Sequence, residues 1–188
     1  MGTINKPIPV KLIIPMLSGS TEILAAAQSQ LIERIGPLDY VSPDLPFDYT
    51  DYYTAELGQH ILRRIVAVRP HIDPGDLAGI KILTNDLEDT FRREGRRTVN
   101  LDPGYLCGGK LVLASTKDQA HRIYIGQGIF AEVTLMFRHG AFVPLPWTYP
   151  DYASDGYLAV LSQIRGIYMS QLRAVRRPSP SLNDQADV

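Results

Sequence analysis

The sequence has little sulfur chemistry and no long apolar run. Cys107 is the only cysteine among the 188 residues, so the chain forms no internal disulfide and no cysteine-based zinc site. A free cysteine is more often a small buried residue than a reactive thiol. The N-terminal apolar run Leu12–Leu17 is too short to span a bilayer, and Lys6 stands where a myristoylation signal needs serine or threonine. We therefore expect a cytoplasmic protein that does not associate with membranes.

The chain also lacks an excess of charge of either sign. It carries 19 basic and 20 acidic residues, whereas a dedicated DNA-binding protein usually presents a strongly basic face. Nucleic acid is therefore the least favoured partner. The arginines available for such a role would be Arg63, Arg64, Arg69, Arg92, Arg93, Arg96 and Arg97.

Several catalytic signatures are missing. There is no GxxxxGK[ST] phosphate loop, no GxGxxG fingerprint, no HExxH helix and no nucleophile elbow. The four histidines lie far apart and supply no metal-binding pair. The sequence thus identifies no cofactor and no metal ligands, and it leaves open whether the protein is an enzyme.

What the sequence does contain is a clear alternation of predicted strands and helices. Ser20 or Thr21 caps a helix that ends at Gly36, and Asp73-Pro74 begins a second helix that ends at Gly95. Strands are expected over 11–17, 38–41, 60–68 and 98–101, with a strand or extended loop over 42–58. This order, β-α-β-β-α-β, is ferredoxin-like and predicts an α+β fold with two helices on one face of an antiparallel sheet.

An antiparallel β-hairpin and a C-terminal helix are expected to extend this start. The hairpin strands span 121–126 and 129–138, with Ile129, Ala131, Val133, Leu135 and Phe137 on one face. His139-Gly140 is a two-residue turn that would pair Phe137 with Phe142. Residues 106–114 fit a strand or a short helix. The final helix, over 155–175, would turn inward Tyr157, Leu161, Ile164, Tyr168, Leu172 and Val175.

Length and composition predict one α+β domain over 1–175 and a disordered tail over 176–188. Within that domain, Arg63, Arg64 and Arg69 are expected to face solvent. The second helix carries a polar face opposite its apolar one, formed by Lys81, Asn85, Glu88 and Arg92.

The densest polar signal is Asn100-Leu101-Asp102-Pro103-Gly104-Tyr105. Pro103 biases Asp102 to an extended backbone, and Gly104 permits a conformation that other residues resist. We expect a sharp turn that presents Asp102 and Tyr105 together. Asp102 is then a candidate general base, metal ligand or hydroxyl acceptor. The equally weighted alternative is a local turn in which Asn100 and Asp102 satisfy backbone groups.

A second polar cluster spans residues 115–122. Lys117, His121 and Arg122 suit an anion such as phosphate or carboxylate, although a solvated loop is the slightly favoured alternative. If the hairpin is centred on Gln127, Arg122 lies opposite Glu132 and the two form a cross-strand ion pair.

Two aromatic segments complete the candidates, Phe47–Tyr53 and Pro144–Tyr152. Such stiff aromatic ribbons stack on planar ligands or dock partners. For the proline-rich second segment, an aromatic lid over the core is the favoured alternative.

Together these motifs resemble an uncharacterised prokaryotic family that is identified by its NLDPGY motif and classed as a domain of unknown function. The resemblance extends to about Leu172 and implies a single-domain protein. Members of the family are often labelled GTP-binding, but this chain has neither a phosphate loop nor a base-reading motif that would support GTP binding. Cys107-Gly108-Gly109 is more glycine-rich than the family pattern. The segments that carry the resemblance are Pro9–Ile13, Pro46–Tyr53, Gly95–Arg97, Asn100–Tyr105, Lys117-Asp118, His121–Tyr124, Ala131–Leu135 and Pro144–Tyr152.

Two functional hypotheses follow from the sequence. The first is a small-molecule-binding protein or an enzyme that acts on a phosphorylated or nucleotide-like anionic ligand. Its catalytic candidates are Asp102, Glu132 and His121, and its ligand-binding candidates are Asn100, Tyr105, Arg97, Lys117 and Arg122. The second is a non-catalytic protein-interaction module, such as a homodimer, that uses the aromatic-proline surfaces.

Overall fold

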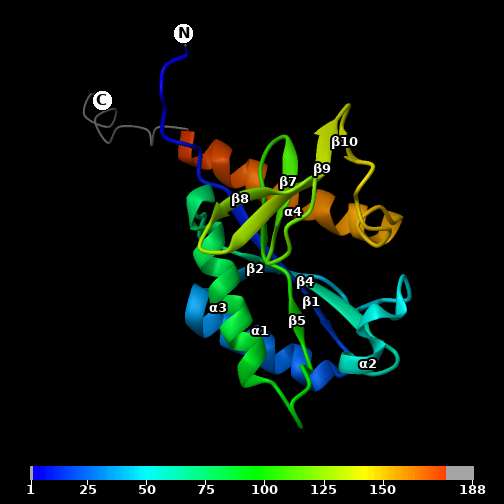
Figure 1. The fold of residues 1–188 in the computed structure, drawn as a ribbon. Helices are drawn as coiled ribbons and strands as arrows, with labels where there is room; N and C mark the ends of the chain where they lie inside the picture. The colour runs from blue at the N-terminus through cyan, green and yellow to red at the C-terminus, as the bar shows by residue number, and fades with distance from the viewer. Residues whose placement is uncertain (1, 177–188) are drawn as a thin grey trace, which may run out of the picture.

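The computed structural model, in which residues 2–176 are described, combines helices and strands around one antiparallel sheet (Figure 1). The predicted α+β class, antiparallel pairing and C-terminal helix are confirmed. Apart from Arg176, the predicted tail lies outside the described residues. The elements in chain order are β1 (Lys11–Ser18), α1 (Thr21–Ile35), β2 (Leu38–Val41), β3 (Leu45–Pro46), the 3₁₀ turn η1 (Asp51–Tyr53), α2 (Thr54–Leu57), β4 (Leu62–Val68), η2 (Pro74–Asp76), α3 (Leu77–Thr90), β5 (Asn100–Leu101), β6 (Gly104–Leu106), β7 (Lys110–Ser115), β8 (Ile123–Gly126), β9 (Ile129–Arg138), β10 (Ala141–Pro144) and α4 (Asp155–Arg176).

The sheet has the strand order β10-β9-β7-β6-β1-β4-β2, with β3 added to β4, β5 to β1 and β8 to β9. All eight residues of β1 are buried, because helices cover both faces of the sheet at this strand. On one face, α1 and α3 pack on the even-numbered residues of β1. On the other, α4 packs on Ile13 and on β4, β7 and β9, and Figure 1 shows it apart from α1 and α3.

Local signals in the sequence explain where most elements start and stop. Ser20 caps α1 by accepting a hydrogen bond from the Ile23 amide, and Gly36 ends the helix at a φ of 132°. His139 and Gly140 adopt positive φ, 50° and 83°, which makes the predicted two-residue turn and pairs Phe137 with Phe142.

Other expectations were wrong or incomplete. Residues 51–57 form η1 and α2 rather than an extended loop, because Thr50 caps the turn by accepting from the Tyr52 amide. The segment 106–114 forms parts of two strands with a turn at Gly108. In α4, Val175 is 80% exposed and does not face the core. No helix in the described part of the chain has both the length and the apolar character to cross a bilayer.

The apolar face of β9 switches sides along the strand. A register shift opposite Leu111 and Val112 places Thr134 as an extra residue in the β7–β9 ladder. As a result Ile129, Ala131 and Val133 pack towards α3, whereas Leu135 and Phe137 pack towards α4. The single apolar face expected from strict alternation is therefore wrong.

The Asn100–Tyr105 motif does not turn. Leu101 pairs with Met16 and Gly104 with Ile13, so β5 and β6 follow β1 in one unbroken register across Pro103. Alternation along this straight strand sends Asp102 and Tyr105 to opposite faces, which excludes the expected shared site. Gly104 is required for a different reason: a Cβ there would lie 2.3 Å from the Val112 carbonyl oxygen.

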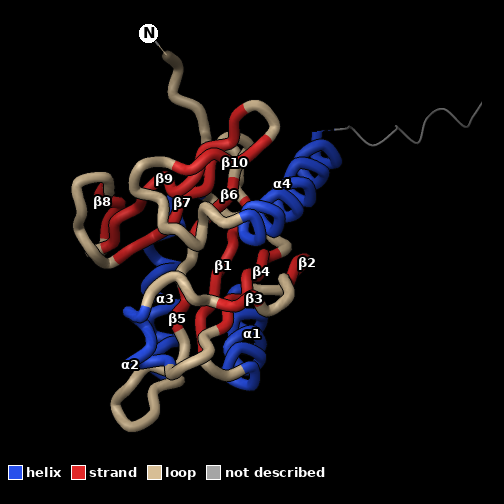
Figure 2. Tube along the Cα trace, turned by 90° about the vertical axis from the view of Figure 1, so that its right-hand side faces the viewer, coloured by secondary structure: helices blue, strands red, loops and turns tan. Residues whose placement is uncertain are grey.

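The sheet divides at this motif. β6 pairs with both β1 and β7, whereas β5 pairs with β1 alone among the described strands. β7 pairs with β9 on its other side and does not pair with β5. β5 and β7 therefore separate at Asp102, as Figure 2 shows from the side. The division leaves a space between β5 and β7 that residues of both strands line.

Candidate functional site

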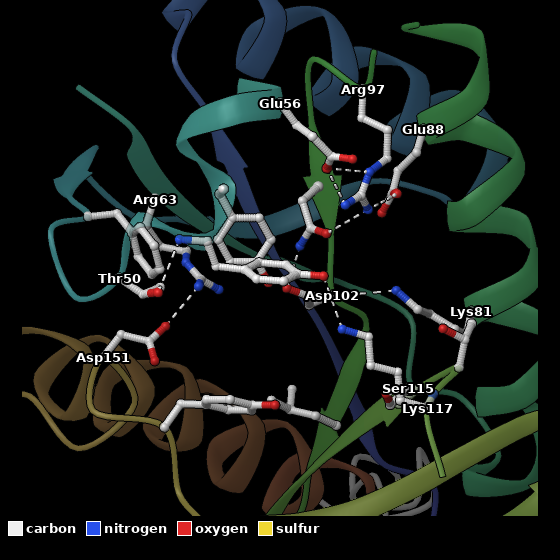
Figure 3. Close-up of a pocket in the computed structure, with 18 of the residues that line it drawn as sticks. Thr50, Glu56, Arg63, Lys81, Glu88, Arg97, Asp102, Ser115, Lys117 and Asp151 are labelled. Carbon is white, nitrogen blue, oxygen red and sulfur yellow. Dashed lines mark hydrogen bonds and ion pairs between the residues drawn. The ribbon is translucent and has the colours of Figure 1, made fainter. Parts of the chain in front are cut away.

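A cleft of about 670 Å³ lies where the sheet divides, and segments far apart in the sequence meet in it (Figure 3). The described residues that line it contribute six cationic and six carboxylate side chains. The cationic residues are Arg63, Lys81, Arg92, Arg97, Lys117 and Arg122, and the carboxylates are those of Glu56, Glu88, Asp89, Asp102, Glu132 and Asp151.

Asp102 occupies the middle of this charged cleft. Its Oδ2 accepts a 2.6 Å hydrogen bond from Asn100 Nδ2, and its Oδ1 lies 3.7 Å from Lys81 Nζ. The carboxylate is 27% exposed, so it faces the open space rather than its own backbone. Asp102 therefore does not act as the local turn residue that the sequence allowed.

Arg97 holds Asn100 in place. Its Nη1 donates to Asn100 Oδ1 at 3.3 Å and to Glu88 Oε2 at 3.2 Å, and its Nη2 donates to Glu56 Oε2 at 2.5 Å. Because Asn100 Oδ1 accepts from an arginine, its Nδ2 is left to donate to Asp102. The chain of contacts Glu56–Arg97–Asn100–Asp102 thus fixes the orientation of the central carboxylate.

α3 supplies two buried groups that are not among the site residues expected from the sequence. Lys81 Nζ donates to the Leu101 carbonyl oxygen at 2.8 Å, and Glu88 Oε1 accepts from the Leu101 amide at 2.7 Å. Burial raises the pKa of Glu88, and nearby Asp102 raises it further against the opposing effect of Lys81. A signal for them was present, since Lys81, Asn85, Glu88 and Arg92 recur at helical spacing.

Arg63 forms the floor of the cleft, although it was expected to face solvent. It is only 3% exposed, because its Nη2 donates to Asp151 Oδ2 at 2.7 Å and its Nη1 to the Tyr152 hydroxyl at 3.3 Å. The guanidinium also lies 5.2 Å from the ring centroid of Phe47. The hydrogen bonds from Arg63 to Asp151 and Tyr152 connect β4 to the loop before α4 and bury the segment around Asp151.

Burial also changes the acidity of groups at this floor. It raises the pKa of the Asp151 carboxyl, which Arg63 opposes. It raises the pKa of the Tyr53 phenol, and the negative charge of Asp102 adds to the effect. Tyr53 therefore stays neutral throughout the physiological range.

Arg122 forms the predicted ion pair with Glu132. Its Nε donates to Glu132 Oε2 at 2.7 Å, its Nη1 to Ser115 Oγ at 2.7 Å and its Nη2 to the Tyr149 hydroxyl at 3.1 Å. The Arg122 side chain is only 3% exposed. It therefore connects β7, β9 and the loop before α4, rather than offering a free cation.

Lys117 is an exposed cation of the cleft, as is Arg92 just after α3, but Arg92 pairs with Asp89. The Nζ of Lys117 donates to the Tyr52 hydroxyl at 3.2 Å and lies 4.9 Å from that ring's centroid. Ser115 lies two residues earlier, at the end of β7, and also lines the cleft, and Figure 3 shows Lys117 directed towards the space around Asp102.

The two aromatic segments line the cleft more than they form a free surface. Phe47 and Tyr152 are almost fully buried, at 8% and 3% exposure. Tyr49, Tyr52 and Tyr149 are partly exposed, but all three face the cleft.

Six of the eight candidate residues thus line one cavity. These are Asn100, Asp102, Arg97, Lys117, Arg122 and Glu132.

The other two do not line this cavity. Tyr105 lines a separate, mainly apolar cavity of about 470 Å³ beside Cys107. His121 lies behind the cleft wall, with Nε2 3.0 Å from Glu132 Oε2 and its ring stacked on Trp147 at 5.5 Å. No group of three histidine, cysteine or carboxylate side chains in residues 2–176 has the arrangement of a metal site.

Comparison with known proteins gives one match. A family model described as a domain of unknown function, DUF4416, matches residues 8–168. No curated protein and no solved structure matches the chain.

Proposed function

The chain belongs to the DUF4416 family, and from that premise we propose that it binds a small phosphorylated or nucleotide-like molecule in its central cleft, with Asp102 as the principal acid–base or hydroxyl-binding group. The observation that carries the proposal is the setting of Asp102. Its carboxylate faces a cavity lined by residues from segments far apart in the chain and is held from behind by Asn100.

The size and lining of the cleft support a small polar ligand. A volume of about 670 Å³ falls within the roughly 300–1,000 Å³ typical of small-molecule sites. Tyr49 and Tyr52 offer faces on which a planar group stacks, and Lys117 offers an accessible cation. Clustered carboxylates whose pKa values are raised by burial are common at functional sites.

Asp102 and Lys81 supply the elements of acid–base chemistry. An ionised Asp102 would accept a proton from a ligand hydroxyl, and the ammonium of Lys81 would stabilise the negative charge that develops nearby. Glu132 is already engaged by Arg122 and His121, so in this proposal it positions the wall rather than reacting.

A thermal-shift screen against nucleotides and sugar phosphates tests the proposal. A true ligand raises the melting temperature by mass action, and the rise should be lost in Asp102→Ala. Asp44→Ala is the matched control, because Asp44 also forms an ion pair, with Arg64, but does not line the cleft. An equal ligand-induced shift in wild type and Asp102→Ala would refute the role of Asp102.

We also propose that the central strands follow the ferredoxin-like order. The neighbours β6-β1-β4-β2, with β5 beside β1, match the order expected of a β-α-β-β-α-β unit. An experimental structure with a different order in these strands would remove this assignment.

A second candidate function is self-association through the edge strand β8. Ile123 and Tyr124 are 73% and 60% exposed, and β8 pairs with β9 alone among the described strands. Edge strands usually carry charge or proline that prevents such pairing, and β8 has neither. Light scattering should detect a homodimer that Ile123→Lys dissociates; a monomeric wild type would exclude it.

A further inference from the structure

We propose that the cleft orients its ligand, with a phosphoryl group at the end of β7, beside Ser115, Lys117 and Tyr52, and sugar hydroxyls at Asp102. The ligand class is therefore a phosphorylated sugar, either free or as part of a nucleotide. This inference rests on the proposed function and adds to it the chemical class and the direction of binding.

Ser115 is the first argument, because its hydroxyl can act only as a donor. Its Oγ accepts from the Lys117 amide at 3.1 Å and from Arg122 Nη1 at 2.7 Å, which occupies both lone pairs. No acceptor in the described part of the chain receives its proton. The free capacity of Ser115 is thus one O–H donor on the cleft wall, and not a nucleophilic oxygen.

Tyr52 and Lys117 continue the same pattern. The Tyr52 hydroxyl accepts from Lys117 Nζ, and within residues 2–176 no acceptor takes its own proton. Lys117 uses one of its three ammonium protons in this bond. Three neighbouring side chains therefore offer donors and one positive charge, which match the several oxygens and the charge of a phosphoryl group.

Arg97 and Arg122, the two arginines that the sequence offered as anion ligands, have little capacity left for a phosphoryl group. The three guanidinium nitrogens of Arg97 and of Arg122 all donate to protein oxygens. Each guanidinium makes four hydrogen bonds to protein oxygens with its five N–H donors, and carboxylates already neutralise its charge, so it offers a bound anion at most one N–H. Lys117 makes no ion pair within 4.0 Å among the described residues, so it remains the available cation at this wall.

The carboxylate of Asp102, in the middle of the cleft, has the reverse polarity. Asp102 Oδ1 lies 3.7 Å from Lys81 Nζ, beyond hydrogen-bond distance, so its lone pairs remain available to a donor. Burial is the main cause that raises the pKa of Glu88 and of Asp151, and the negative charge of Asp102 adds to it in both, because Asp102 repels each of these carboxylates. A phosphoryl group would add to that repulsion, whereas sugar hydroxyls would donate to Asp102.

Isothermal titration calorimetry distinguishes the phosphoryl position at Ser115 and Lys117 from the hydroxyl position at Asp102. Ribose 5-phosphate and glucose 6-phosphate would be titrated beside ribose and glucose, into wild type, Lys117→Met, Ser115→Ala and Asp102→Asn. Lys117→Met should weaken binding of the phosphorylated sugars at least about tenfold, the effect of one lost charge-assisted contact, while leaving the plain sugars unchanged. Ser115→Ala should do the same to a smaller degree, and Asp102→Asn should weaken both members of each pair equally.

Lys110→Met is the matched control, since Lys110 lies at the other end of β7, outside the cleft. Adenosine monophosphate identifies the source of the sugar phosphate: tighter binding than ribose 5-phosphate, with the same dependence on Lys117, indicates a nucleotide. If Lys117→Met weakens plain and phosphorylated sugars alike, or neither, the orientation is wrong. If neither phosphorylated sugar nor adenosine monophosphate binds wild type, the ligand class is wrong, while an Asp102-dependent thermal shift with another compound would leave the proposed function standing.

Discussion

The protein contains two lysine–aspartate ion pairs whose surroundings differ. One joins Lys11 to Asp39, and the other joins Lys81 to Asp102. Lys11 is fully buried, and its Nζ contacts both Asp39 Oδ2 and Gln171 Oε1 of α4. Gln171 Nε2 donates to the same Asp39 oxygen at 2.6 Å, which closes the group. Lys81 and Asp102 stand 3.7 Å apart at the wall of the cleft.

The difference separates a structural ion pair from one that retains binding capacity. Burial lowers the pKa of Lys11, so desolvation of its charge is the larger effect and the contacts with Asp39 offset it. Asp102, in contrast, is 27% exposed to the cleft and repels the carboxylates of Glu88 and Asp151. We expect the closed pair to contribute mainly to stability and the open pair mainly to binding.

The largest expected effect is on the closed pair. Asp39→Ala should lower the free energy of unfolding by about 3–5 kcal/mol, because it leaves the Lys11 charge buried without its carboxylate. Urea unfolding followed by circular dichroism measures the loss. Asp44→Ala, which breaks a more exposed pair, should cost clearly less; an equal loss in the two variants would remove the distinction.

The second largest effect is expected at Gly104, in the strand where the sheet divides. Gly104→Ala should destabilise the protein by roughly 1–3 kcal/mol, because the new Cβ meets the Val112 carbonyl oxygen at 2.3 Å and forces β6 and β7 apart. Gly109→Ala is the control, since a Cβ there meets no atom within 4 Å. Equal melting temperatures for the two variants would contradict this explanation of the glycine in the motif.

A smaller effect on stability is expected at the open pair. Asp102→Asn should change the free energy of unfolding by less than about 1 kcal/mol, because loss of the Lys81 attraction is offset by relief of repulsion from Glu88 and Asp151. Urea unfolding of this variant beside Asp39→Asn compares the pairs directly. A loss as large as that of Asp39→Asn would mean that both pairs are structural.

The smallest effect is a change in pH dependence. The pKa of Glu88 in the folded protein lies above its ordinary value of 4.5. At a pH between the ordinary and the raised pKa, the folded protein therefore binds more protons than the unfolded chain. The stabilising contribution of Glu88 is complete below its ordinary pKa and is lost as pH rises through the raised one. Glu88→Gln should therefore flatten the fall in stability above pH 4.5, measured by urea unfolding across that range.

Asp151 keeps part of the slope in the Glu88→Gln variant, since burial raises the pKa of its carboxyl in the same direction. An unchanged slope in Glu88→Gln would show that Glu88 is ionised equally in the folded and unfolded states.

Local patterns predicted the elements better than the site. Ser20, Gly36 and His139-Gly140 act through neighbours a few residues away, and their roles were correct. Arg122 and Glu132 were also paired correctly, because a hairpin fixes its own register. These contacts depend on short stretches of chain that the sequence displays directly.

The cleft depends on long-range packing that no local pattern shows. Arg63 is buried because a loop 88 residues later brings Asp151 over β4. Lys81 faces the site because β5 and β7 separate beside α3. Tyr105 was misplaced for a simpler reason, since the expected turn at Pro103 is a straight strand.

Trp147, the only tryptophan of the chain, is stacked on His121 at the rim of this architecture. Its indole Nε1 donates to the Val133 carbonyl oxygen at 2.9 Å, and Tyr149, two residues further on, faces the cleft. The molecule therefore carries a built-in optical reporter, whose emission should follow any movement of the loop that bears Trp147 and Tyr149.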